Sequence, residues 1–214
     1  MSGPREELAA AGAHLAGLGL SPGASGNLSV REDDRVLITP TGADLAALDP
    51  MDLSELDTDG RHLAGPRPSK EFPLHTAFYR RAPETRAVVH LHSRQASALS
   101  CLPPWSERSA IPPLTPYFVM RVGRTPLIPY AEPGDPSQAG RLEHLAFGFR
   151  AVLLQNHGPV TAGTSLGAAV DAAVELEETA ALLLLLGHQE PRLLDEGQAT
   201  ALARRYGTHW GTDG

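Results

Sequence analysis

The sequence predicts an α/β fold, a mixed β-sheet with flanking helices, formed by a single domain over residues 1–214. Two segments of alternating polarity, 27–31 and 35–39, are separated by a short acidic turn and predict a β-hairpin. Farther along the chain, strand patterns alternate with helix patterns, which favours helix-connected strands in the same sheet. A chain of 214 residues, 42% of them hydrophobic, is long enough to fill one such core.

The longest helical pattern begins after Ser165, which can cap it, and runs to Leu186, where Gly187 stops it. Other helices are expected over residues 5–19, 71–81, 93–100, 137–147 and 196–205. Besides the hairpin, strands are expected within 49–58 and at 86–92 and 151–155, with short strands around Val119 and at 127–128.

Composition limits the expected partners and the compartment. The formal net charge is −7 and no block of Lys or Arg occurs, so nucleic acid is not an expected partner. The lone cysteine, Cys101, excludes an intrachain disulfide and suits a reducing cytoplasm. The apolar run 180–186 is too short to span a membrane, and no signal-peptide pattern follows Met1. We therefore expect a soluble cytoplasmic protein.

Three histidines stand where a divalent metal could bind. His90 and His92 lie in the apolar strand pattern AVVHLH, and alternation places both rings on one face of that strand. His157 follows the second apolar strand pattern, 151–155. Burying two unpaired imidazoles side by side costs several kcal/mol, and a shared metal removes that cost. The pattern favours an open catalytic zinc site, with manganese, iron or cobalt as alternatives.

The other histidines have a simpler interpretation as surface or hydrogen-bonded core residues: His14, His62, His144, His188 and His209. His75 is more ambiguous because it follows Glu71 on the same predicted helix, although a structural role is favoured over metal ligation.

Glu71 has two interpretations. It is either an ordinary first-turn glutamate, stabilised by the helix dipole, or the general acid/base beside the metal and a fourth ligand when substrate is absent. Loops of small residues at 23–27 and 41–42 expose backbone N–H groups, and Ser69 and Lys70 add a hydroxyl and a cation at a helix start. Loops of small residues are usually ordinary turns, but these loops together with Ser69 and Lys70 indicate an anion site for a phosphate.

At these residues the chain resembles the class II aldolase/adducin family, which includes fuculose-phosphate aldolase and ribulose-5-phosphate 4-epimerase. The shared motifs are SGNLSVR at 25–31, TPTG at 39–42, PSKE at 68–71, AVVHLHS at 87–93 and NHG at 156–158. They occur in the family order and cover nearly the whole chain. A closer match is the branch of 3-oxo-tetronate 4-phosphate decarboxylases, which rests on segments 70–75, 114–123, 130–136 and 175–180.

The resemblance implies a three-layer α/β/α fold with a central, largely antiparallel sheet. It implies a homotetramer with the active site near a subunit interface. It also implies one Zn2+ per subunit, held by His90, His92 and His157, with Glu71 as the acid/base.

The resemblance also implies substrate contacts for individual residues of this chain. Asn27, Thr41, Gly42 and Ser69 would contact the phosphate. Lys70 stands where the aldolases have a second serine, and its cation could hold a substrate carboxylate or the phosphate. Tyr117 is the candidate for the tyrosine that handles the aldehyde oxygen in the aldolases.

The implied activity is that of a metal-dependent carbon–carbon lyase acting on a phosphorylated sugar acid. It would convert a 3-oxo-tetronate 4-phosphate into dihydroxyacetone phosphate and CO2, through an enediolate whose charge the zinc takes up. A sugar-phosphate aldolase of the same family is the alternative. A 4-epimerase and a non-catalytic adducin-like module are weaker ones, and the last predicts lost metal ligands, whereas all three histidines and Glu71 are present.

Overall fold

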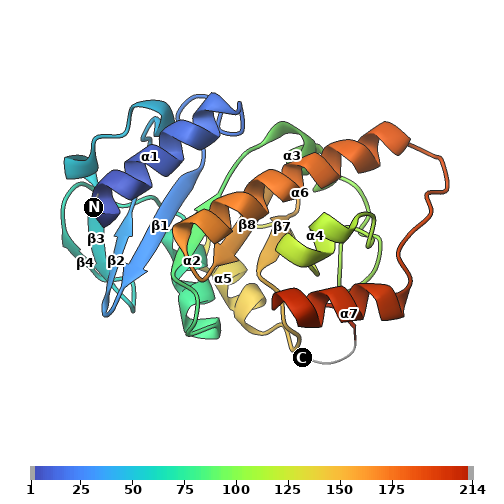
Figure 1. The fold of residues 1–214 in the computed structure, drawn as a ribbon. Helices are drawn as coiled ribbons and strands as arrows, with labels where there is room; N and C mark the ends of the chain where they lie inside the picture. Colours follow the sequence, from blue (N-terminus) through green and yellow to red (C-terminus); the bar gives the residue numbers. More distant parts are fainter. Residues whose placement is uncertain (1–2, 212–214) are drawn as a thin grey trace.

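In the computed structural model, which describes residues 3–211, one eight-stranded sheet forms the centre of the molecule (Figure 1). Its strand order is β4-β3-β2-β1-β5-β8-β7-β6, and every neighbouring pair is antiparallel except β6 and β7. The strands are β1 Asn27–Glu32, β2 Arg35–Ile38, β3 Ser54–Asp57, β4 His62–Ala64, β5 Ala87–His90, β6 Leu127–Ile128, β7 Ala151–Leu154 and β8 Gly158–Gly163.

Helices cover both faces of this sheet (Figure 1). One face packs on α2 Phe72–Arg81 and α5 Pro136–Glu143. The other packs on α1 Pro4–Gly17, α3 Arg94–Leu99, α4 Pro116–Arg121, α6 Leu166–Leu186 and α7 Glu196–Tyr206. Short 3-10 turns, η1 Leu45–Ala47 and η2 Pro50–Asp52, lie beside α1. The three-layer α/β/α fold and the largely antiparallel sheet are confirmed.

Strand β5 shows how the alternation of side chains positions the histidines. Val88 contributes to the core under α2 and α5, whereas Ala87 and Val89 contribute to the core under α1 and α6. His90 therefore shares the face of Val88, which is the face on which α2 begins. Because both faces of β5 are covered, all four of its residues are buried, as the continuous apolar pattern predicts.

The structure differs from several of the expected elements. Val119 lies in helix α4, not in a strand, because Pro116 occupies the first turn and the Thr115 hydroxyl accepts the Phe118 N–H at 3.1 Å. Strand β8 was not expected from the sequence. Its residues, GPVTAG, are small and lack an apolar period, yet all six are buried between β5 and β7.

No helix among residues 3–211 is both long and apolar enough to cross a bilayer.

Glu177 ties the long helix α6 to the start of α3. Its buried carboxylate accepts the Ser93 hydroxyl at 2.7 Å and the backbone N–H groups of Gln95 and Ala96, each at 2.8 Å. These amides belong to the first turn of α3, which has no partner for them within the helix. The contact therefore caps α3 and anchors the chain directly after His92.

We expect Glu177→Ala to lower the free energy of unfolding by about 3 kcal/mol, because it leaves three donors unpaired, two of them buried. Urea unfolding at one protein concentration measures this loss. The matched control is Glu178→Ala, which removes an exposed carboxylate from the same helix and should change stability by less than about 0.5 kcal/mol. Equal stabilities of the two variants would contradict the capping role.

Candidate active site

Three imidazoles converge at one end of β5. The Nε2 atom of His92 lies 3.1 Å from Nε2 of His90 and 3.0 Å from Nε2 of His157. His90 ends β5, and the antiparallel register of β5 with β8 brings the β7–β8 turn, which carries His157, to the same end. The sequence-based prediction that these three rings meet is confirmed. His92 lies outside the strand in which the sequence pattern predicted it, because β5 ends at His90.

A backbone contact orients the His90 ring, and the geometry of the turn positions His157. The Nδ1 atom of His90 lies 2.9 Å from the carbonyl oxygen of Pro159, which can only accept, so Nδ1 carries the proton and Nε2 presents a lone pair. The turn before His157 places Asn156 in the left-handed region, at φ 57°. Gly158 then passes so close to β5 that a Cβ atom there would collide with the carbonyl group of Leu91.

Glu71 completes the cluster. It immediately precedes α2 and is only 5% exposed. Its Oε2 atom lies 3.3 Å from Nε2 of His90, and its Oε1 atom lies 3.4 Å from Nε2 of His157. One ligand atom from each of the four residues falls within 4.8 Å of the others.

This donor set fits a divalent metal. A tetrahedral zinc site with bonds of about 2.05 Å has ligand–ligand separations of about 3.3 Å. The His90–His92, His92–His157, His90–Glu71 and His157–Glu71 separations run from 3.0 to 3.4 Å. Among the described residues, Glu71 Oε1 is buried without a hydrogen-bond partner. Converging lone pairs beside an unsatisfied carboxylate oxygen are costly to bury unless a cation joins them.

The electrostatics favour the protonation states that a metal needs. Burial and, to a lesser extent, the neighbouring His90 lower the pKa of His92 and of His157 to about 4. Burial alone would raise the pKa of Glu71, but His90, His157 and the Asn27 amide hold it well below its usual range. Neutral imidazoles and an ionised carboxylate are the ligating forms at neutral pH.

These shifts predict acid destabilisation of the metal-free protein. Burial also lowers the pKa of His75 to about 3. Between pH 6.5 and about 4 the unfolded chain therefore binds protons that the folded chain does not, and the free energy of unfolding falls as pH decreases through this window. Urea unfolding of chelator-treated protein at several pH values measures the slope. It should become shallower in His92→Ala but not in His14→Ala, which changes an exposed ring. A pH-independent stability above pH 4 would contradict the shifts.

A cavity of about 200 Å³ opens beside the cluster. It brings together the predicted anion-binding loops and the cluster of Glu71 and the three histidines. Its lining residues are Ala24, Ser25, Gly26, Asn27, Pro40, Thr41, Gly42, Ser69, Lys70, Glu71 and His92. The Asn27 side chain already donates to Glu71 Oε2 at 2.9 Å, so part of its hydrogen-bonding capacity is used within the protein. Tyr117 is 58% exposed on α4 and does not line this cavity.

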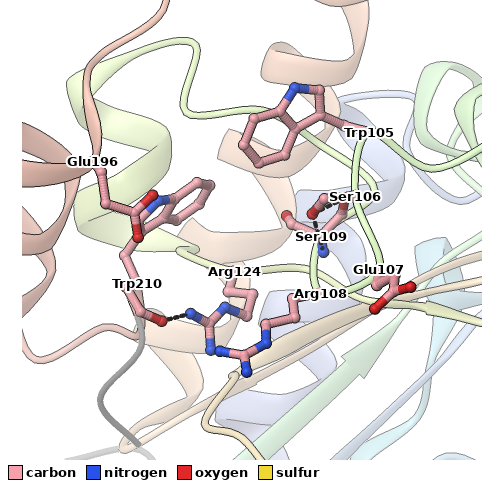
Figure 2. A pocket seen from close by; sticks show the side chains of 9 residues that line it. Trp105, Ser106, Glu107, Arg108, Ser109, Arg124, Glu196 and Trp210 are labelled. Atoms are coloured by element: carbon pink, nitrogen blue, oxygen red, sulfur yellow. Dashed lines mark hydrogen bonds between the residues drawn. The ribbon is translucent and has the colours of Figure 1, made fainter.

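A larger cavity, of about 440 Å³, lies away from this chemistry (Figure 2). Figure 2 shows the guanidinium groups of Arg108 and Arg124 close together, with Trp105 and Trp210 on the far side of the hollow. Arg124 donates to the carbonyl oxygen of Gly211. No residue of the metal cluster lines this cavity, so we place the active site at the smaller one.

Three further buried residues support the site from behind, and of these only His75 was predicted from the sequence to have a structural role. Ser29 hydrogen-bonds both His75 and Tyr79, and His75 also contacts Asn27. One signal was available, because His75 and Tyr79 follow Glu71 at helical intervals of four residues and so lie on one face of α2. Their partners on β1 could not be identified without the strand register.

Comparison with known proteins agrees with this geometry. Residues 6–184 match the family model described as the class II aldolase and adducin N-terminal domain. A 3-oxo-tetronate 4-phosphate decarboxylase from Pectobacterium atrosepticum is 46% identical over 191 residues, covering 89% of this chain and 88% of that protein. An L-fuculose phosphate aldolase from Haemophilus influenzae is 34% identical over 197 residues, covering 90% and 88%. The crystal structure of YgbL from Klebsiella pneumoniae has a TM-score of 0.88 at 45% identity, covering 92% and 96%.

Proposed function

The chain belongs to the class II aldolase and adducin family, and from this we propose that it decarboxylates a 3-oxo-tetronate 4-phosphate to dihydroxyacetone phosphate and CO2. It is an enzyme of the lyase class, which the decarboxylases and the aldolases among its relatives share. The observation that carries the proposal is the Glu71 and three-histidine cluster, which opens onto a cavity lined by the loops expected to bind the phosphate.

His90, His92 and His157 would hold the metal, and zinc is the ion we propose for an imidazole set. When bound, the ion acts as a Lewis acid that stabilises negative charge developing on the ketone and neighbouring hydroxyl oxygens of the substrate. The contact of His90 Nδ1 with Pro159 keeps the ring oriented, so that Nε2 stays directed into the cluster.

The phosphate would lie among Thr41, Gly42, Ser69 and Asn27, which border the same cavity. Gly42 adopts φ 73°, which turns the backbone of this loop in a way that glycine allows at little cost. Anchoring the phosphate through groups remote from the breaking bond orients the reacting carbon beside Glu71.

Glu71 would move the proton. Decarboxylation breaks the bond between the carboxylate carbon and C2, and its electron pair passes into the ketone to form an enediolate. Glu71, after taking up a proton from solvent, delivers it to C2 and yields dihydroxyacetone phosphate. Retro-aldol cleavage by an aldolase of the family leaves the same enediolate and releases an aldehyde instead. The two activities therefore differ only in the departing fragment.

A direct assay tests this proposal. The zinc-loaded enzyme is incubated separately with a 3-oxo-tetronate 4-phosphate and with L-fuculose 1-phosphate, and CO2 and aldehyde release are measured. We expect CO2 release from the first substrate with a kcat/KM at least about 100-fold above that for aldehyde release from the second. Aldehyde release as the faster reaction would instead favour the aldolase, the second candidate, which the 34% identity to L-fuculose phosphate aldolase supports.

Lys70 is our proposed determinant for the substrate carboxylate. Its side chain is exposed at the cavity edge, beside the loop residue Gly134. We expect Lys70→Ala to raise KM for the acid substrate about 10-fold, because a charge-assisted contact is lost. Steady-state kinetics of CO2 release check this, with Lys70→Arg retaining most of the affinity. Unchanged affinity and turnover in Lys70→Ala would refute the role.

We further propose that the enzyme is a cytoplasmic homotetramer and that Tyr117 acts in the active site of a neighbouring subunit. The exposure of Tyr117 and its absence from the cavity lining of its own chain support an intersubunit role.

A 4-epimerase would use the same enediolate, with re-addition of the aldehyde at the opposite face. The non-catalytic module is disfavoured because the cluster is complete.

A further inference from the structure

A chain of five buried side chains runs back from the active site into the layer between β1 and α2. Glu71 Oε2 lies 2.9 Å from Asn27 Nδ2, and Asn27 Oδ1 lies 2.6 Å from His75 Nε2. His75 Nδ1 lies 2.7 Å from Ser29 Oγ, which lies 2.6 Å from the Tyr79 hydroxyl. The metal chemistry described above uses none of the last three residues.

The chain of contacts follows from the periods of the two elements. Glu71, His75 and Tyr79 are spaced four residues apart along the start and body of α2, a rise of about 6 Å per step. Asn27 and Ser29 are two residues apart on β1, a rise of about 6.6 Å. The matching rises let side chains of the helix and the strand alternate along one line.

Chemistry sets the direction of every hydrogen bond in this line. An ionised carboxylate only accepts, so Asn27 must present its NH2 group to Glu71 and its oxygen to His75. His75 must therefore donate from Nε2, and a neutral ring then accepts at Nδ1 from the Ser29 hydroxyl. Ser29 accepts in turn from Tyr79. All of the donated protons point toward Glu71.

This arrangement makes the two oxygens of Glu71 different. Oε2 is held by the Asn27 amide. Oε1 is buried and has no hydrogen-bond partner among the residues that the structure describes. A proton placed on Oε2 would compete with the Asn27 N–H, whereas a proton on Oε1 leaves the whole line intact.

We propose that His75 is a positioning residue, which orients the Asn27 amide and through it the Glu71 carboxylate, so that Oε1 is the atom that exchanges a proton with substrate carbon. The inference rests on the proposed function, because it requires Glu71 to act as the acid/base. It adds a role for a histidine that touches neither substrate nor metal.

The test uses a partial reaction that needs no departing fragment. Zinc-loaded enzyme in D2O should exchange a hydroxymethyl proton of dihydroxyacetone phosphate for deuterium, which proton NMR follows. Wild-type enzyme without exchange would refute the proposed function itself. Exchange in the wild type that is unchanged in His75→Leu would refute only the positioning role.

We expect His75→Leu to lower kcat for exchange about 10- to 100-fold, with KM and zinc content within about twofold of wild type. His75→Gln should restore kcat to within about fivefold, because its amide can donate to Asn27. Thr76→Val is the matched control: it removes a buried hydroxyl of α2 that donates to the Pro73 carbonyl at 3.1 Å, and it should leave kcat unchanged. Equal losses in all three variants would indicate a merely structural effect and overturn the proposal.

A measurement on the wild type keeps the proposal testable if His75→Leu does not fold. Nitrogen-15 NMR of histidine-labelled, zinc-loaded enzyme distinguishes the two neutral tautomers of a ring. We expect His75 to carry its proton on Nε2, with Nδ1 unprotonated. A proton on Nδ1 would reverse the direction of the Ser29 contact and contradict the inferred line.

Discussion

Replacing His92 by alanine is expected to abolish lyase activity, with a loss of kcat/KM of at least about a thousandfold, and to release the metal. His92 Nε2 lies 3.1 Å from Nε2 of His90 and 3.0 Å from Nε2 of His157. Its removal leaves two imidazoles and a carboxylate around a gap. Activity assays and metal analysis after dialysis give the two readouts.

His14→Ala is the matched control, since it removes an exposed imidazole from α1. It should retain both metal and activity. Wild-type activity in His92→Ala would exclude the proposed metal mechanism. Retained metal with lost activity would instead assign His92 to substrate binding.

Glu71→Gln is expected to lower kcat about 10²- to 10⁴-fold while the protein remains folded and retains at least one metal ion per subunit. The substitution keeps the size of the side chain, and its amide oxygen can still accept from Asn27 Nδ2. It removes the group that takes up and delivers the proton. Deuterium exchange into dihydroxyacetone phosphate should fall by the same factor as CO2 release, because both require protonation of the same carbon.

Glu32→Gln provides the control, because it neutralises an exposed carboxylate at the far end of β1. A variant Glu71→Gln that lost its metal would show that Glu71 acts mainly as a ligand. If the variant retained both the metal and the full rate of deuterium exchange, a residue other than Glu71 would have to transfer the proton. The comparison with His92→Ala thus separates metal binding from proton transfer.

The fold was predictable where one local pattern dominated. The long helix α6 begins after Ser165 and ends before Gly187, as its capping residues predict. The hairpin of β1 and β2 also follows the sequence pattern, because its two strands are adjacent in the chain. Strand β8 was missed because GPVTAG gains its strand conformation from pairing with both β5 and β7, neither of which affects its local pattern.

The sequence by itself identified the four residues that form the candidate metal site. The alternation of His90 and His92, the turn at His157 and the motif around Glu71 are local, and the structure brings all four residues together. Resemblance of the motifs to the class II aldolase/adducin family is likewise confirmed.

Only the tertiary structure decided what holds these groups in position. Glu177 reaches α3 across more than 80 residues of sequence, and Asn27 on β1 reaches both Glu71 and His75 on the segment that begins α2. Such contacts depend on strand register and on helix placement over the sheet, and no local periodicity specifies either one. The chemistry of the site was therefore present in short motifs, whereas its preorganisation arises from packing between distant elements.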